Sequence, residues 1–266
     1  MSGIPSFGDA QDGREIKLLG FRLHPLTGEE VVAEIRAAVT EQRRLIMTNA
    51  NLHALAVMYQ SPAMAKLLSQ PDSRVMIDSM PVLFLANLLG HRLPRAKRTT
   101  SLDFYDAMFR VGTELGWSFG YVGADPETLE AGLAVLRQQV PGLRIEGRNG
   151  FFPVGTDQPV GTEREIIDWL VERSHDVVIV GMGMPRQEEW IERIQHWVPS
   201  RVFLTAGAYI DYKGGTQQPP PRWLGQIGLE WSHRLLHSPR RLSYRYLIEP
   251  LVLIWRLIVS RHPQKR

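Results

Sequence analysis

The chain has 266 residues, 44% of them hydrophobic, and a formal net charge of +3. This composition supplies enough apolar surface for one large core or two smaller ones, which excludes a disordered chain. There is no cysteine, which excludes a disulfide framework and thiolate chemistry, and because the first residues lack the apolar run of a signal peptide we expect a chain that is not exported.

Predicted strands and helices alternate along the chain. Thr27 and Glu30 form a capping-box pattern ahead of the first helical run. Residues 81–89 are apolar enough to predict a buried helix, and a basic turn follows them. Strands are predicted over residues 15–23, 44–52, 73–78, 117–123, 143–147, 177–183 and 201–207, and helices over residues 29–39, 53–60, 63–70, 81–89, 102–115, 126–140, 163–173 and 187–197.

This alternation predicts the fold class. Strands separated by helices favour an α/β fold with a Rossmann-like, mostly parallel, doubly wound sheet that has helices on both of its faces. We expect residues 1–215 to form this domain and residues 216–266 to form a basic, apolar, helical C-terminal appendage.

Small and polar residues lie at the carboxyl ends of four of the predicted strands or directly after them. In a parallel sheet, ligands bind beyond the carboxyl ends of the strands, so these segments form the candidate site. Each of them also has an ordinary reading, because capping side chains gather wherever a strand turns into a helix. The four segments are Thr48 to Asn51, Asp78, Gly123 to Pro126, and Gly181 to Glu188.

The segment VVIVGMGMPRQEEWI, residues 177–191, combines a buried strand with a glycine-containing turn. Gly181 and Gly183 allow the backbone to approach a ligand, and Pro185 suits the first turn of a helix whose free N–H groups favour an anion. Arg186 stands where the dinucleotide-binding pattern requires its third glycine. The turn therefore predicts an anion site and argues against a nucleotide-binding oxidoreductase, which remains the alternative function.

The C-terminal end is strongly basic. Residues 222–266 hold nine Lys or Arg against two Glu, a net +7, so the rest of the chain carries −4. A helix over residues 244–260 confines its charges to one narrow stripe, and Pro250 makes it a poor spanning segment. These features favour an interfacial helix on an anionic membrane surface. Docking on the protein's own core or on a second subunit remains the alternative, and the long apolar runs argue against nucleic acid.

Three segments together resemble one known family. They are GYVGADPETLEAGLAVLRQQVPGLRIEG, VVIVGMGMPRQEEWI and GLEWSHRLLHSPRRLSYRY, within a similarity that runs from Leu45 to Tyr246. They are similar to the bacterial glycosyltransferases of the WecG/TagA/CpsF family, which elongate lipid-linked precursors of teichoic acid, enterobacterial common antigen and exopolysaccharides. The chain departs from the family pattern where Ser79 stands for a glycine, and where residues 218–221 read Gln-Pro-Pro-Pro for Arg-Ala-Pro.

The resemblance implies an inverting glycosyltransferase with a Rossmann-like catalytic domain. Its donor would be a nucleotide diphosphate sugar, by preference a UDP-sugar, and its acceptor a polyprenyl-diphosphate-linked saccharide of exopolysaccharide or cell-envelope polymer biosynthesis. No cofactor is expected, and since the chain has no Asp-x-Asp pair to hold a metal, arginines are expected to bind the diphosphate. The protein would be cytoplasmic and peripherally attached to the inner face of the bacterial cell membrane, with a homo-oligomer left open.

The resemblance also assigns roles to single residues. Asp78 falls where the family places its proposed catalytic base, the group that takes a proton from the acceptor hydroxyl. Thr48 is the second residue expected at the catalytic centre. The expected substrate-binding residues are Asn49, Asn51, Arg98, Gly123, Gly181, Gly183, Gln187, Glu188, Arg234, Arg241 and Arg245, of which the last three belong to the appendage that is thought to close over the donor.

Overall fold

The computed structural model describes residues 15–154, 159–221 and 229–237, together with residues 224, 240, 243, 244 and 249, without the side chains of residues 233, 234 and 237. Its strands are β1 (Ile16–Leu18), β2 (Phe21–Leu23), β3 (Leu45–Ala50), β4 (Ser73–Ile77), β5 (Ser118–Gly123), β6 (Arg144–Arg148), β7 (Val177–Gly181) and β8 (Val202–Thr205). Its helices are α1 (Gly28–Thr40), α2 (Leu52–Met58), α3 (Pro62–Ser69), α4 (Met80–Leu88), the 3₁₀ turn η1 (Arg95–Lys97), α5 (Ser101–Glu114), α6 (Pro126–Gln139), α7 (Gly161–Arg173), α8 (Arg186–Ile194), α9 (Tyr209–Lys213) and α11 (Glu230–His237).

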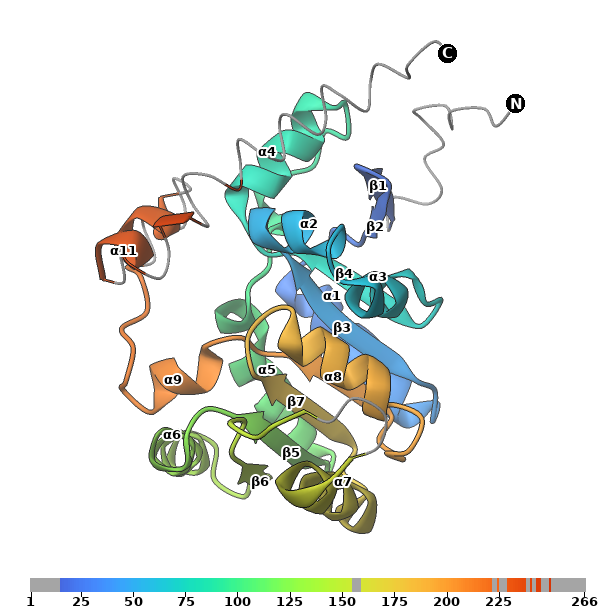
Figure 1. Cartoon of the computed structure of the whole chain (residues 1–266), viewed down its shortest axis with the longest axis vertical. Helices are drawn as coiled ribbons and strands as arrows, with labels where there is room; N and C mark the ends of the chain where they lie inside the picture. Colours follow the sequence, from blue (N-terminus) through green and yellow to red (C-terminus); the bar gives the residue numbers. More distant parts are fainter. Residues whose placement is uncertain are drawn as a thin grey trace.

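Six parallel strands form the central sheet in the order β4-β3-β8-β7-β5-β6 (Figure 1). Helices α1, α5 and α6 cover one face, where Ile35 and Phe109 belong to a large apolar core. Helices α3, α7 and α8 cover the other face through a second core that contains Leu170 and Trp190. The predicted Rossmann-like α/β fold is confirmed, and the sheet is parallel throughout.

The middle of the sheet joins distant parts of the chain. β8 lies between β3 and β7, pairing Met47 with Leu204 and Val180 with Thr205. The chain runs outward from β3 to β4, crosses to β5 and β6, and returns through β7 to β8. The carboxyl ends of β3, β7 and β8 therefore lie side by side at one edge of the sheet, where ligands of such folds bind.

The first predicted strand is wrong, because residues 15–23 form an antiparallel hairpin rather than one strand. β1 and β2 pair Ile16 with Leu23 and Leu18 with Phe21. Leu19 and Gly20 both have positive φ, 55° and 85°, which is the geometry that a two-residue hairpin turn requires. The apolar sequence of residues 15–23 does not predict this turn, because Leu rarely adopts the positive φ that the turn requires.

The predicted burial of residues 81–89 is only half right. Val82, Leu83 and Ala86 of α4 are buried, but Phe84 is 68% exposed and Leu88 is 71% exposed. α4 follows β4, the outermost strand of the sheet, so a core covers only one of its sides. No helix in the described ranges is long and apolar enough to cross a bilayer. An apolar helix side therefore faces outward at this end of the molecule.

Candidate active site

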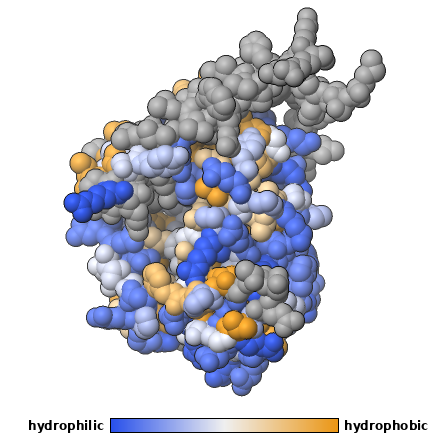
Figure 2. All heavy atoms as spheres, viewed as in Figure 1, coloured by the Kyte–Doolittle hydropathy of each residue, from blue (hydrophilic) through white to orange (hydrophobic). Residues whose placement is uncertain are grey.

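A cavity of about 860 Å³ opens at the carboxyl edge of the sheet. It collects the ends of β3, β4, β7 and β8, the loops before and after α9, and residues Glu230, Tyr244 and Glu249 of the predicted appendage. The face seen in Figure 2 is hollowed near its middle, with hydrophilic residues at the border. Of the predicted site residues, the cavity brings together Asn49, Asn51, Asp78, Gly181, Gly183 and Gln187.

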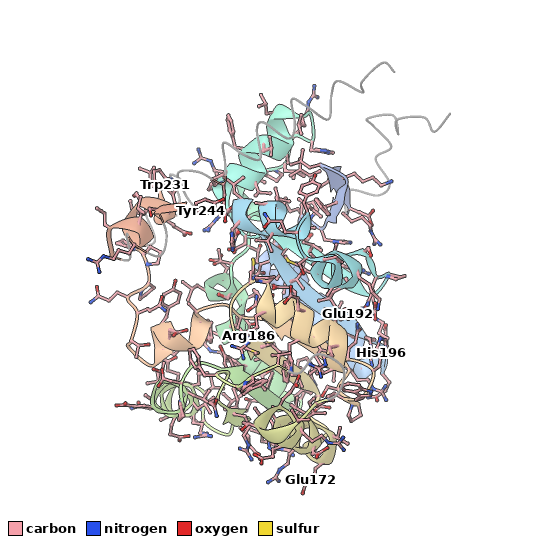
Figure 3. All side chains as sticks on the ribbon, in the orientation of Figure 1. Glu172, Arg186, Glu192, His196, Trp231 and Tyr244 are labelled. Carbon is pink, nitrogen blue, oxygen red and sulfur yellow. The ribbon has the colours of Figure 1, made fainter. Side chains whose placement is uncertain are left out.

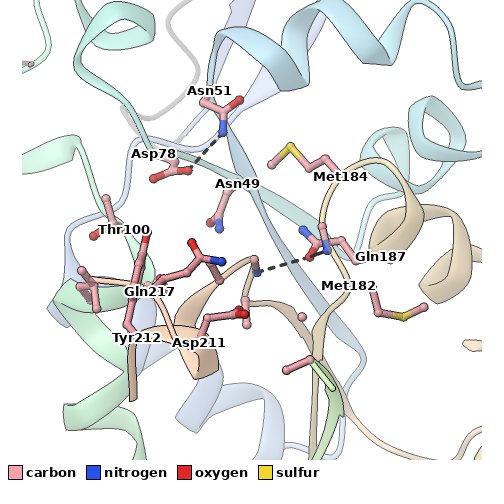
Figure 4. A pocket seen from close by; sticks show the side chains of 18 of the residues that line it. Asn49, Asn51, Asp78, Thr100, Met182, Met184, Gln187, Asp211, Tyr212 and Gln217 are labelled. Atoms are coloured by element: carbon pink, nitrogen blue, oxygen red, sulfur yellow. Dashed lines mark hydrogen bonds between the residues drawn. The ribbon is translucent and has the colours of Figure 1, made fainter. Parts of the chain in front are cut away.

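Asp78 lies at the mouth of β4. Its N–H donates to the carbonyl of Ala50 at 3.0 Å, and Asn51 Nδ2 donates to Asp78 Oδ2 at 3.4 Å (Figure 4). The residue that caps α4 is Ser79, whose side chain makes no capping bond. The ordinary reading of Asp78 as a helix cap is therefore wrong, and its carboxyl group lines the cavity instead.

Asn49 and Thr48 point to opposite sides of β3, as neighbours in a strand do. Asn49 lines the cavity, where its Nδ2 donates to the carbonyl of Thr205 at 3.5 Å and its Oδ1 has no partner among the described residues. In the view of Figure 4 it lies between Asp78 and Gln187. Thr48 is fully buried, and its side chain does not line the cavity. Its catalytic role therefore stays a prediction.

Gln187 ties two glycine-containing loops together. Its Oε1 accepts from the N–H of Gly183 at 3.2 Å and from the N–H of Gly207 at 3.3 Å, and its Nε2 donates to Glu188 Oε1 at 2.7 Å. The Gly183 N–H is thus bound by the protein itself. Glu188 is completely buried behind Gln187 and does not line the cavity.

Three glycines let the backbones behind the cavity touch. A Cβ on Gly123 would lie 2.6 Å from the Gly181 carbonyl oxygen, and one on Gly150 would lie 2.7 Å from the Gly123 Cα. Gly181 and Gly150 line the cavity, whereas Gly123 lies behind them. Gly123 therefore acts through close packing here, and its contact with substrate stays a prediction.

Arg186 is the described arginine that lines the cavity. Its Nη2 donates to the carbonyl of Phe152, and its guanidinium lies 5.3 Å from the centre of the Phe152 ring. Figure 3 shows it beside the start of α8. Burial lowers its pKa, although an arginine stays charged at neutral pH.

Two side-chain contacts, one of them an ion pair, join the domain to the predicted appendage. Arg98 Nη1 lies 3.2 Å from Glu230 Oε1 at the start of α11, and His53 Nδ1 lies 2.7 Å from Glu249 Oε2. Arg98 does not line the cavity itself, but Glu230 does. The side chain of Arg234 and all of Arg241 and Arg245 lie outside the described residues, so their predicted contacts with substrate stay predictions, as does the boundary after residue 215.

A family model described as glycosyl transferase WecG/TagA/CpsF family matches residues 16–266. The chain belongs to the WecG/TagA/CpsF family. It is therefore a glycosyltransferase, and the oxidoreductase alternative falls away.

Curated relatives agree on one activity. A protein of Bacillus spizizenii is 25% identical over 182 residues, which cover 68% of this chain and 67% of the relative. A protein of Staphylococcus aureus is 22% identical over 233 residues, which cover 86% of this chain and 87% of the relative. Both are named N-acetylglucosaminyldiphosphoundecaprenol N-acetyl-beta-D-mannosaminyltransferase.

Several lining residues of this WecG/TagA/CpsF chain were missed in the sequence. Asp211 and Tyr212 on α9 line the cavity, and so do Phe151 and Glu230. The strand over residues 201–207 was predicted, so the rule that directs attention to strand ends applied equally to the segment that carries Asp211. Glu230 belongs to a segment that carries the family resemblance, but the strand-end rule does not reach it, because only the folded appendage brings it to the cavity.

The described lining of the glycosyltransferase cavity is acidic. Its carboxylates are Asp78, Asp211, Glu230 and Glu249, against the single guanidinium of Arg186. Within the described residues, no group of three His, Asp or Glu side chains is placed to hold a metal ion. A diphosphate in this cavity therefore needs more positive charge than the described residues provide.

Proposed function

We propose that this protein transfers a sugar from a UDP-sugar to a polyprenyl-diphosphate-linked saccharide, with inversion at the anomeric carbon. The observation that carries the proposal is the Asp78 carboxyl group in a large cavity at the carboxyl edge of the sheet of a WecG/TagA/CpsF protein. The names of the relatives support N-acetylmannosamine as the sugar to test first and an N-acetylglucosaminyl lipid as the acceptor. The product would be a precursor of a cell-envelope polymer or an exopolysaccharide.

Asp78 acts as the general base in this reaction. Its carboxylate takes the proton of the acceptor hydroxyl while that oxygen attacks the anomeric carbon of the donor sugar. The new bond joins the acceptor oxygen to the anomeric carbon, and the bond from that carbon to the phosphate oxygen breaks on the opposite side. UDP leaves with the bonding electrons. The Asn51 amide, 3.4 Å from Asp78 Oδ2, helps to orient the carboxylate.

The departing diphosphate requires positive charge. Arg186 supplies one guanidinium from the start of α8, and four carboxylates of the lining oppose it. We propose that arginines of the basic C-terminal segment, Arg234, Arg241 and Arg245, supply the remainder when the donor is bound, since Arg binds phosphate oxygens in a bidentate manner. This assignment makes the appendage part of the active site.

The proposed acceptor carries a long lipid, so the protein works at a membrane surface. We propose peripheral attachment to the inner face of the cell membrane, through the basic C-terminal segment and the outward side of α4. Phe84 and Leu88 are the exposed apolar residues of α4, and exposed Arg92 and Arg95 follow them. Apolar side chains flanked by cations suit the interface of an anionic bilayer.

The proposal is tested by incubating the full chain with a panel of UDP-sugars and a short-chain polyprenyl diphosphate that carries N-acetylglucosamine. We expect one donor to release UDP and to add a single sugar to the lipid, as read by mass spectrometry. Absence of transfer from every UDP-sugar in the presence of anionic vesicles, together with no binding of UDP by calorimetry, would refute it.

A further inference from the structure

The amide of Gln187 has nearly all of its hydrogen-bonding groups occupied by the protein. A glutamine amide can accept two hydrogen bonds at Oε1 and donate two from Nε2. Both acceptor positions of Gln187 are taken by the N–H groups of Gly183 and Gly207, and one donor is taken by Glu188. What Gln187 can offer to the cavity that it lines is therefore one N–H donor and no acceptor.

Glu188 is unusual for a carboxylic acid in a folded protein. Its side chain is fully buried and forms no ion pair among the described residues. Its Oε1 accepts from Gln187, whereas Oε2 has no partner in the described part of the chain. An ionised carboxylate in such surroundings loses its hydration without compensation, so burial favours the neutral acid.

Two buried hydroxyl groups lie on the same side of the sheet as Glu188. Ile46 and Phe203, two residues before Thr48 and Thr205, pack in the core under α8, so strand alternation turns both threonines toward α8. The register that pairs Met47 with Leu204 places the threonines next to each other. Neither hydroxyl oxygen has a partner among the described residues.

Neither threonine hydroxyl forms a hydrogen bond with Glu188 among the described residues, so Oε2 lies among buried polar groups without a partner of its own. The charged side chain that acts on Glu188 is that of Glu189 in the same helix, and its negative charge favours the neutral form of Glu188. Burial is the largest cause of this preference. The hydrogen bond from Gln187 and a backbone hydrogen bond act in the opposite direction, but the net effect raises the pKa of Glu188 to about 8.

We propose that Glu188 is a positioning residue which, as an uncharged acid, fixes the Gln187 amide so that it clamps the Gly183 and Gly207 loops and presents one N–H donor to the substrate. The donor would meet an acceptor oxygen of the nucleotide sugar, and this last step rests on the proposed function. The clamp itself does not, because it exists between protein groups alone.

The experiment compares amide hydrogen exchange at Gly183 and Gly207 in three ligand-free proteins, the wild type, Glu188→Gln and Glu188→Met. The Gln variant keeps an uncharged acceptor for Gln187 Nε2, and the Met variant keeps the volume but has no acceptor. We expect wild-type protection in Glu188→Gln and exchange about 10-fold faster or more at both glycines in Glu188→Met. Equal protection in the Met variant, which a space-filling role would give, overturns the proposal, and so does loss of protection in the Gln variant.

A second comparison needs only the wild type and Glu188→Gln. Once exchange is corrected for its intrinsic pH dependence, protection of the two glycines should fall in the wild type as pH rises from about 4.5 to about 8, because the opened state releases a proton that the closed state keeps, and stay constant in Glu188→Gln. Parallel pH profiles would overturn the proposal even if Glu188→Met does not fold. Failure of the proposed function is read separately, from UDP binding and sugar transfer by the wild type.

Discussion

Asp78 combines an amide neighbour, Asn51, with a position in the cavity lining. The substitution Asp78→Asn removes the proposed base but preserves the size of the side chain. We expect turnover to fall by a factor on the order of 100 or more, while calorimetry finds UDP binding close to that of the wild type. The matched control is Asp211→Asn, which changes a carboxylate of the same cavity away from β4. Near-normal turnover in Asp78→Asn would show that Asp78 is not the general base.

Glu188 also gives stability a pH dependence. Its pKa is about 8 in the folded protein against 4.5 as the ordinary value, so the folded state binds a proton that the unfolded state has released between these values. Wild-type stability should therefore decrease as pH rises from about 4.5 to about 8. Glu188→Gln does not titrate. We expect its melting temperature, relative to that of the wild type, to rise by about 5 °C or more between pH 5.5 and pH 8 in scanning fluorimetry. A constant difference would mean that Glu188 is ionised throughout.

At the scale of elements, the loop before α5 and helix α11 are joined by the ion pair between Arg98 and Glu230, both partly buried. Removing one member leaves the other charge poorly solvated, so α11 should separate more often from the domain. We expect Arg98→Glu and Glu230→Arg each to speed limited proteolysis of the chain between residues 216 and 229 about 10-fold. The double exchange of both residues should restore protection.

This exchange also distinguishes two roles of Arg98. A clasp depends only on opposite charges, so the double variant should recover transfer along with protection. An arginine that binds the donor diphosphate is not replaced by glutamate, and in that case protection returns without transfer. The sequence assigned Arg98 to substrate binding, and the structure places its guanidinium on Glu230, which itself lines the cavity.

Helix α4 supplies an apolar side that the described core does not cover. We expect Phe84→Ser combined with Leu88→Ser to reduce sedimentation with anionic liposomes about 10-fold at low salt, because both apolar side chains are lost from the bilayer interface. The matched control is Leu115→Ser, an exposed apolar residue that follows α5 at the opposite edge of the sheet. Equal sedimentation of the α4 variant and the control would exclude α4 from the membrane contact.

At the scale of the whole molecule, positive charge is concentrated in residues 222–266, which carry a net +7 against −4 in the remainder. We expect truncation after Pro239 to abolish sedimentation with anionic liposomes and to lower transfer sharply, because Arg241 and Arg245 are lost with the segment. High salt should weaken the attachment of the intact chain. Intact protein that ignores anionic liposomes at low salt would contradict the membrane proposal.

The sequence predicted the edge of the sheet at which the cavity lies. Asn49 lies near the carboxyl end of one strand, and Asp78 and Gln187 follow two others. Parallel strands bring their carboxyl ends to one edge, so a simple rule suffices for these residues. The rule could not predict which of Gln187 and Glu188 lines the cavity, since both are polar. Only the packing of α8 against the sheet determines that Glu188 is buried. The same limit holds for Thr48 and Asn49, because strand alternation says that they diverge but not which of them meets the cavity.

Burial of α4 failed as a prediction for a related reason. The apolar composition of residues 81–89, considered alone, predicts a buried helix. Whether a second layer covers it depends on the order of the strands, and β4 is at the edge of the sheet rather than in its middle. Strand order depends on contacts between distant residues, which composition and periodicity do not contain.

The insertion of β8 between β3 and β7 has a consequence for synthesis on the ribosome. Until residue 205 has left the exit tunnel, the nascent chain can form only two separate half-sheets, β4-β3 and β7-β5-β6. Each half presents a bare hydrophobic strand edge, which is a template for wrong pairing between chains. The halves are joined only when the last strand arrives, and the cavity at the carboxyl edge of the sheet forms in the same event. Nascent chains stalled before β8 should therefore be clients of chaperones that shield strand edges.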